Sequence, residues 1–293
     1  MSKNKPIIAM MYDFDKTLCT KDMQEYTFIP GLNMTAKEFW DKTVQFRTHE
    51  KMDAVLAYMY QMLHQSNKSD KSVHREDFVM LGKDIEFFHG IDTWFDRVNA
   101  YAKQKGACVE HYVISSGLKE IIEGTSIAKR FKEIYACEFY YDQNGVAKWP
   151  KFAVNYTEKT QFLFRINKGV LDVDNNEMVN KYIPERDRRI PFRNMIYIGD
   201  GLTDVPCMQL VKINGGKSIA VYGPHKSSAK QTAAEIVRDG RANFMEVADY
   251  SAGKDLEKLV YAIIDKIVAT DVIAKAEEKC ETISEKTLKS AGA

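Results

Sequence analysis

The sequence predicts an α/β protein built on a doubly wound, mostly parallel sheet. First, short apolar runs alternate along the chain with stretches of helical periodicity, the pattern of strands joined by crossover helices. Second, several of these runs end directly at acidic or hydroxyl residues. Ligands of such sheets bind beside the carboxyl ends of the strands, so this coincidence locates a candidate site. Third, a length of 293 residues leaves room for roughly two domains.

The first two expected strands lie far apart in the sequence. The apolar run 7–12 ends at Asp13-Phe14-Asp15, and the next run of similar quality, 112–114, ends at Ser115. About a hundred residues separate the two runs, whereas a plain strand–helix–strand unit needs roughly 30. A segment of roughly 75 residues is therefore inserted between the first two strands.

The inserted segment has the pattern of helices. Residues 35–38, Thr-Ala-Lys-Glu, fit a capping box before Phe39, and apolar residues between 52 and 63 follow helical spacing. Further helical stretches are expected at about 74–88 and 91–105. We expect a helical cap domain over residues 21–100 and a core domain formed by residues 1–20 and 101–293.

After Ser115 the alternation of strands and helices resumes. Asn144-Gly145 is a strong turn signal and predicts a hairpin within this part of the chain. Expected strands lie at 134–141, 146–154, 195–198 and 218–222, and expected helices at 157–167 and from 256 onward. Beyond Ala274 the last helix is rich in Lys and Glu and has little apolar content.

Composition excludes several classes of protein. The 42 Lys and Arg residues nearly balance the 41 Asp and Glu residues, so no global positive field attracts nucleic acid or an anionic membrane. The five cysteines are scattered without a Cys-x-x-Cys pair, which argues against a zinc ribbon or a secreted disulfide framework. The apolar run near the start is too short for a signal peptide or a membrane span. We therefore expect a cytoplasmic protein without nucleic-acid or membrane partners.

Four carboxylates are expected to converge at one edge of the sheet. Asp13 and Asp15 follow the first strand, Asp200 follows the strand at 195–198, and Asp204 lies one helical turn further on. Like charges brought together raise one another's pKa and cost free energy, which a hard cation offsets. Oxygen-only ligands without His or Cys nearby favour Mg²⁺. Turn or cap roles are the alternative, most of all for Asp204 taken alone.

The same residues resemble a known family. Residues 13–17, Asp-Phe-Asp-Lys-Thr, are similar to the Asp-x-Asp-x-Thr motif of the haloacid dehalogenase superfamily. Val-Ile-Ser115-Ser-Gly resembles its second motif, and residues 199–204, Gly-Asp-Gly-Leu-Thr-Asp, resemble its acidic fourth motif. The third motif is a single lysine, for which Lys159 is preferred because it opens a helix, and Lys168 remains an alternative. The resemblance covers about residues 6–250, and three of its four motifs are specific.

This resemblance implies a Rossmann-like core with an inserted C1-type cap, closest to the phosphoserine-phosphatase-like branch. It implies that Asp13 is the nucleophile and that Asp15 acts first as general acid and then as base. Ser115 would donate a hydrogen bond to phosphate, and Lys159 would be the cation that holds phosphate and Asp13. The implied Mg²⁺ ligands are Asp13, the backbone carbonyl of Asp15, Asp200 and Asp204. Thr203 departs from the Asn that this branch often has, which leaves the substrate open.

These residues predict a phosphatase that hydrolyses a small phosphorylated metabolite through an aspartyl-phosphate. Asp15 favours phosphoryl chemistry, because dehalogenase members of the family lack this second aspartate. Two alternatives are a phosphotransferase that uses the same intermediate and a catalytically silent phosphate-binding protein on the same fold. Oligomeric state is not predicted.

Five further residues are candidate substrate contacts. Thr17, Ser116 and Gly117 belong to the first two motifs and lie next to the expected phosphate site. Glu25 and Arg47 lie in the first part of the expected cap, where they could meet an amino or carboxyl group of the substrate. The alternative for each of these two charged residues is a surface salt bridge.

Overall fold

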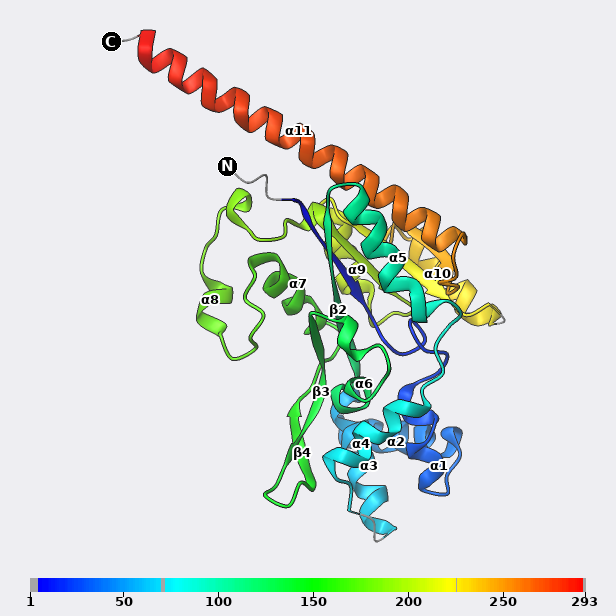
Figure 1. The fold of residues 1–293 in the computed structure, drawn as a ribbon. Helices are drawn as coiled ribbons and strands as arrows, with labels where there is room; N and C mark the ends of the chain where they lie inside the picture. Colours follow the sequence, from blue (N-terminus) through cyan, green and yellow to red (C-terminus); the bar gives the residue numbers. More distant parts are fainter. Residues whose placement is uncertain (1–4, 70–71, 225, 292–293) are drawn as a thin grey trace.

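A twisted sheet forms the centre of the protein (Figure 1). The computed structural model describes residues 5–69, 72–224 and 226–291. Within these residues the sheet has seven strands in the order β4-β3-β2-β1-β5-β6-β7, all parallel except for the antiparallel pair β3–β4. The strands are β1 (Ile7–Tyr12), β2 (Cys108–Leu118), β3 (Glu133–Tyr141), β4 (Ala147–Phe152), β5 (Met195–Gly199), β6 (Lys217–Tyr222) and β7 (Phe244–Val247).

The order of the strands confirms the predicted doubly wound topology. From β1 the chain runs outward through β2 and β3 to β4, and it then returns to the other side of β1 for β5, β6 and β7. The winding direction therefore reverses between β1 and β5, which pair directly with each other. The crevice at such a reversal is where α/β sheets bind their ligands.

Helices cover both faces of the sheet. They are α5 (Ile91–Gln104), α6 (Lys119–Glu123), α7 (Lys159–Lys168), α9 (Val205–Ile213), α10 (Ser227–Arg238) and α11 (Asp255–Ala291), whereas α8 (Asn176–Asn180) packs on α7. Tyr12 accepts a hydrogen bond from Trp94 of α5, at 2.9 Å, whereas Tyr197 of β5 donates to Asp204, which precedes α9. Because Met11 rather than Tyr12 pairs with Tyr197, these two tyrosines point to opposite faces, and so α5 and α9 cover opposite faces.

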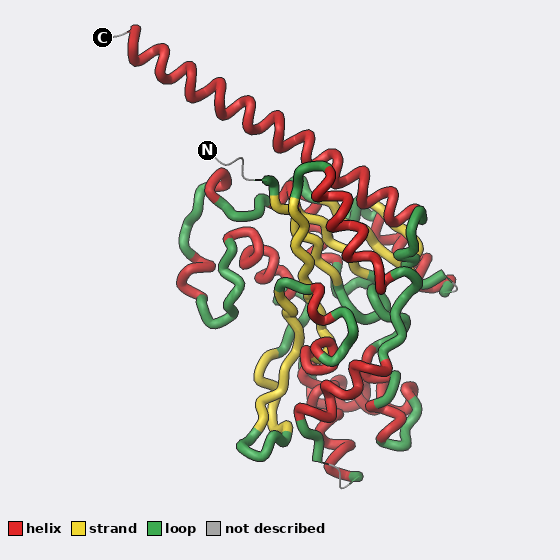
Figure 2. The backbone as a smooth tube through the Cα atoms, viewed as in Figure 1, coloured by secondary structure: helices red, strands yellow, loops and turns green. Residues whose placement is uncertain are grey.

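The residues between β1 and α5 form a separate group of helices at the carboxyl ends of the strands (Figures 1 and 2). The helices are α1 (Phe28–Gly31), α2 (Ala36–Glu50), α3 (Ala54–Lys68) and α4 (Arg75–Leu81). The predicted capping box begins α2, with Thr35 and Glu38 each bonded to the other's backbone. Short 3₁₀ helices occur at Met23–Glu25, Gly82–Asp84, Ala128–Arg130, Glu185–Asp187 and Phe192–Asn194.

Two neighbouring segments connect this group of helices to the sheet. The backbone N–H of Thr20 donates to the carbonyl of Glu86, and that of Phe88 donates to the carbonyl of Leu18, both at 3.0 Å. The predicted boundary at residue 100 falls inside α5, which packs on β2 and α11. We therefore propose that the insertion comprises residues 21–85, called the helical insertion below, and that α5 belongs to the core.

The helix expected at 74–88 is shorter in the structure. Helix α4 ends at Leu81, and Gly82 follows at a close contact with α6. A Cβ atom at Gly82 would lie 2.3 Å from the carbonyl oxygen of Ile121, so only glycine fits there. The chain then turns back toward the sheet, where Phe87 bridges to Cys19.

The long C-terminal helix α11 begins against the core and ends beyond it (Figure 1). Its first part buries Leu256, Val260, Ile264 and Ile267 against the sheet layer, as the apolar spacing predicted. Its second part projects past the body of the molecule, and the side chain of Ile283 there is exposed. No helix within the described part of the chain is both long and apolar enough to cross a membrane.

Candidate active site

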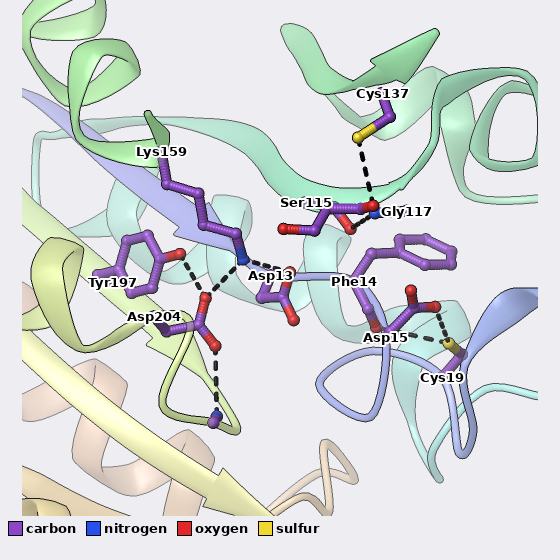
Figure 3. A network of polar contacts seen from close by, with 12 residues as sticks. Asp13, Phe14, Asp15, Cys19, Ser115, Gly117, Cys137, Lys159, Tyr197 and Asp204 are labelled. Atoms are coloured by element: carbon purple, nitrogen blue, oxygen red, sulfur yellow. Dashed lines mark hydrogen bonds and ion pairs between the residues drawn. The ribbon is translucent and has the colours of Figure 1, made fainter. Parts of the chain in front are cut away.

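Asp13 occupies the position at which the winding of the sheet reverses. It directly follows β1, and its backbone N–H donates to the carbonyl of Ile198 in β5 at 2.9 Å. The residue is only 5% exposed. One carboxylate oxygen, Oδ1, accepts a hydrogen bond from the Lys159 ammonium at 2.8 Å (Figure 3). The structure thus holds a buried carboxylate at the carboxyl edge of the central strand.

Lys159 is the buried cation of this site. It is the first residue of α7, is 1% exposed, and donates to Asp13 and, at 2.7 Å, to Asp204. Burial alone lowers the pKa of the ammonium, but the two carboxylates more than offset this effect, so its pKa is raised and the group stays charged. The alternative lysine, Lys168, instead donates to the backbone carbonyls of Val179 and Lys181.

Asp204 is fixed by contacts on both carboxylate oxygens. Oδ1 accepts from Lys159 and from the Tyr197 hydroxyl, the latter at 2.8 Å, and Oδ2 accepts from the backbone N–H of Gly201 at 3.3 Å. A Cβ atom at residue 199 would lie 2.5 Å from Oδ2, so glycine is required there for Asp204 to reach the site. In the Gly-Asp-Gly sequence, Gly199 therefore leaves the space that the Asp204 side chain occupies, and Asp200 supplies a carboxylate to the cluster.

Three carboxylates meet closely enough to hold a metal ion. Asp13, Asp200 and Asp204 each offer an oxygen within 4.8 Å of the others. Burial and the Asp204 charge raise the pKa of Asp13, and burial and the Asp13 charge raise that of Asp200. One lysine cannot neutralise three carboxylates. The donors are all oxygens and the local charge is negative, so the residues present fit a hard divalent cation such as Mg²⁺.

Asp15 lies apart from this cluster although it is only two residues from Asp13. Its Oδ1 accepts hydrogen bonds from the Met23 backbone N–H, at 2.8 Å, and from the Cys19 thiol (Figure 3). Burial, then the charges of Asp22 and Asp13, raise the pKa of Asp15 well above its usual value. A carboxyl group with a raised pKa can hold a proton near neutral pH and donate it.

Three hydroxyl groups of the first two motifs have unused hydrogen-bonding capacity. Ser115 is fully buried where β2 becomes irregular, and its Oγ accepts from the Gly117 N–H at 3.0 Å, which leaves its own proton free to donate. The buried hydroxyls of Thr17 and Ser116 have no hydrogen-bond partner. Buried polar groups are normally paired, so these hydroxyls suit the oxygens of a bound anion.

Glu25 and Arg47, the two predicted substrate contacts in the first part of the cap, have different surroundings in the structure. Arg47 of α2 lines a cavity of about 270 Å³ that opens beside Asp15. Glu25 instead accepts a hydrogen bond from the Trp40 indole at 2.8 Å. A larger cavity of about 640 Å³, between β3, β4 and the segment before α8, contains none of the predicted site residues.

Sequence reasoning missed several residues of the site. Tyr197 holds Asp204, and Tyr58 donates to the Ser116 carbonyl at 2.6 Å, but both look like core tyrosines in the sequence. Helical spacing could have identified Trp40 from the sequence, because it lies seven residues before the predicted Arg47 and therefore on the same face of α2. In the structure this face lines the cavity.

The family comparison agrees with this geometry. Residues 10–209 match the family model for the haloacid dehalogenase-like hydrolases. The match spans the first strand, the helical insertion and the acidic cluster at Asp200 and Asp204. The chain belongs to this family of hydrolases.

Individual relatives are more distant. An uncharacterized protein of Borreliella burgdorferi is 26% identical over 294 aligned positions, and the alignment covers 91% of this chain and 99% of that protein. A crystal structure of a HAD family hydrolase from Salmonella enterica serovar Typhi has a TM-score of 0.53 at 17% identity, covering 83% of this chain and 68% of the other. A phospho-aspartyl intermediate analogue of phosphoserine phosphatase has a TM-score of 0.51 at 15% identity, covering 87% and 98%. At these identities the structural likeness concerns the fold.

Proposed function

We propose that the protein is a magnesium-dependent phosphatase that hydrolyses a small phosphorylated metabolite of the cytoplasm through an aspartyl-phosphate on Asp13. One observation carries this proposal: Asp13 lies at the sheet reversal, paired with Lys159 at 2.8 Å and beside two further carboxylates, while Asp15, whose pKa burial raises, lies apart from them. A phosphate monoester is a dianion, so a carboxylate can approach it only where positive charge offsets the repulsion.

In the first half-reaction, a carboxylate oxygen of Asp13 forms a bond to phosphorus and the bond to the leaving oxygen breaks. Asp15 gives its proton to that oxygen, so the product leaves as an alcohol. Lys159 and the Ser115 hydroxyl offset the negative charge on the phosphoryl oxygens.

In the second half-reaction, Asp15 is the base. Its carboxylate takes a proton from water as the water oxygen bonds to phosphorus, and the acyl-phosphate bond to Asp13 breaks. Inorganic phosphate leaves and Asp13 is a carboxylate again. Both steps need a site from which bulk water is excluded, and the helical insertion lies over the carboxyl edge to provide this.

A magnesium ion would be held by Asp13, Asp200, Asp204 and the backbone carbonyl of Asp15, and when bound it would supply positive charge to the phosphoryl oxygens. Phosphatase activity should disappear with EDTA and return with Mg²⁺. Asp200→Asn should weaken Mg²⁺ binding measured by calorimetry, because it removes a charged ligand that has no recorded ion-pair role in the fold. Full turnover of phosphate esters in metal-free buffer would overturn the proposal.

A further inference from the structure

The cavity of about 270 Å³ beside Asp15 has the position expected of a pocket for the leaving group. This interpretation of the cavity rests on the function proposed above. Asp15 protonates the leaving oxygen in that scheme, so the rest of the alcohol must occupy the space next to Asp15. The cavity is open to solvent and is lined mainly by the loop after β1, by one face of α2 and by the start of α3, with Ser116, Tyr156 and Thr203 completing the lining. The side chains that line the cavity therefore indicate which kind of alcohol it accepts.

A fixed aromatic wall forms one side of this cavity. The Trp40 indole N–H donates to Glu25 at 2.8 Å, and the ring packs edge-on against Phe39 and Tyr58. Tyr58 in turn donates to the Ser116 carbonyl at 2.6 Å. These contacts hold both rings in place before any ligand binds, and a preorganised aromatic surface favours a flat ring at low entropic cost. The link through Ser116 also places this wall toward the phosphate end of the cavity.

The polar groups of the cavity favour an anion. Arg47 lines it and forms no ion pair with any residue in the described part of the chain. It lies seven residues after Trp40 on the same face of α2, about 10 Å further along the helix axis. The acidic Asp22, which also lines the cavity, is paired with Lys16 at 2.5 Å. Gln24 is 2% exposed and adds a neutral amide to the lining.

An ammonium group finds no matching partner in this cavity. Asp15 is committed to proton transfer in the proposed scheme, the Asp22 carboxylate already has the Lys16 ammonium as its partner, and Glu25 accepts from Trp40. The cation Arg47 would repel a positively charged substituent. A leaving group that carries a negative charge at its far end matches the cavity, and one that carries a positive charge does not.

We propose that the natural substrate is the phosphate monoester of an alcohol that carries an aromatic ring next to the ester and an anionic group on the far side of the ring. The ring would lie against Trp40 and Tyr58, and the anionic group would reach Arg47.

Four esters of primary alcohols test the ring and the anion separately: 4-carboxybenzyl phosphate, benzyl phosphate, 4-carboxybutyl phosphate and butyl phosphate. All four esters release a primary alcohol of similar acidity, so differences in kcat/KM report mainly on the pocket rather than on leaving-group chemistry. We expect the ring and the carboxylate each to raise kcat/KM by about tenfold or more, which is the range that one apolar contact or methylene group contributes in a specificity pocket.

Variants of the two wall residues assign each effect. Trp40→Ala should remove the advantage of the ring-bearing esters, and Trp40→Phe should keep part of it because a flat surface remains. Arg47→Gln should lower kcat/KM only for the two carboxylate esters. Lys42→Gln removes a charge from the same helix outside the cavity, and Trp149→Ala removes an aromatic side chain that is 67% exposed on β4, so both are matched controls.

The outcomes separate this proposal from the function on which it rests. If the wild-type protein hydrolyses all four esters with equal kcat/KM, the substrate class is wrong and the phosphatase assignment stands. If none of the four esters is hydrolysed and p-nitrophenyl phosphate is also inert with Mg²⁺, the phosphatase assignment itself fails. A preference for the ring that survives Trp40→Ala would overturn the role of the aromatic wall.

Discussion

At the scale of single residues, Lys159 has the most demanding position in the site. It is the cation in direct contact with both Asp13 and Asp204, and all three side chains are buried. Removing one member of a buried ionic group leaves the others uncompensated, which costs more than the group itself contributes. Lys159 should therefore matter both for the fold of the site and for the charge that a phosphate meets.

Lys159→Met should lower kcat for phosphate esters by about 10²-fold or more, the loss seen when one preorganised charge-stabilising group is removed. Lys168→Met is the matched control, because its ammonium only joins two backbone carbonyls near α8. Steady-state kinetics at saturating Mg²⁺, with the circular dichroism of each variant, makes the comparison. Equal losses in the two folded variants would contradict the assignment of Lys159.

The sequence alone could predict Asp13, Asp15, Ser115 and Asp200, because each lies just after an apolar run and strand ends converge in this fold. In the structure Ser115 lies within β2, which continues to Leu118. It could not separate Lys159 from Lys168, since both lie on α7 and only the packing of that helix decides which end enters the site. Likewise the sequence left Glu25 as a substrate contact or a surface salt bridge, and only the structure reveals its hydrogen bond from Trp40. The sequence alone could not predict which side chains contact each other when they lie far apart along the chain.

At the scale of elements, β1, β2 and α5 meet around a buried imidazole. His111 of β2 is 3% exposed and lies within 3.0 Å of the Tyr12 hydroxyl, with Asn99 of α5 near its other nitrogen. Burial, with a smaller effect of the Arg130 charge, lowers the pKa of His111 to about 3. The native ring therefore stays neutral under conditions in which the ring of an unfolded chain takes up a proton.

This difference makes stability fall as the pH is lowered. The unfolded state binds one more proton than the native state between about pH 6.5 and pH 3, so the free energy of unfolding should decrease by about 2 kcal/mol from pH 7.5 to pH 5 through this residue. Urea titrations at both pH values measure the loss. His111→Gln should remove this part of the pH dependence, whereas His49→Gln, on an exposed imidazole, should keep it. An unchanged slope in His111→Gln would refute the argument.

Most strands were predictable because buried parallel strands read as continuous apolar runs. β7 and the short helices α6, α8, α9 and α10 were not predicted. The four residues of β7 are only partly buried and lack a sustained apolar run, and α6 has five residues. Helix α4 ended early for a reason invisible in the sequence, namely the contact of Gly82 with the backbone of α6.

At the scale of the whole molecule, we propose that the core carries out the reaction and that the helical insertion selects the substrate. Its two connections to the core are hydrogen-bonded to each other between Thr20 and Glu86, so the core can be closed there by a short link. The clustered carboxylates Asp13, Asp200 and Asp204 and the lysine Lys159 all lie outside the insertion. The walls of the leaving-group cavity, by contrast, come largely from α2 and α3.

Replacing residues 21–85 with a short Gly-Ser linker should therefore leave a core that discriminates poorly between phosphate esters. Its basal activity toward p-nitrophenyl phosphate should fall less than its preference among metabolites, because the residues of the reaction remain. The ratio of kcat/KM values across an ester panel measures this, with circular dichroism to establish that the core is folded. A folded core with the wild-type ranking would show that selection does not reside in the insertion.

The central claim is that Asp13 carries the phosphoryl group and Asp15 moves the protons. Trapping the phosphoprotein in a rapid-quench experiment tests both statements at once. With p-nitrophenyl phosphate, whose leaving group needs no proton, Asp15→Asn should release a burst of nitrophenolate near one per active site. Hydrolysis should then be slower by about 10²–10⁴-fold, the usual contribution of general acid–base catalysis.

The trapped species should be stable in acid and cleaved by hydroxylamine, as an acyl-phosphate is, and Asp13→Asn should yield none of it with any ester. Phosphoprotein that still accumulates in Asp13→Asn would contradict the assignment of the nucleophile. The absence of a burst in Asp15→Asn, with alkyl and nitrophenyl esters slowed equally, would contradict its acid–base role.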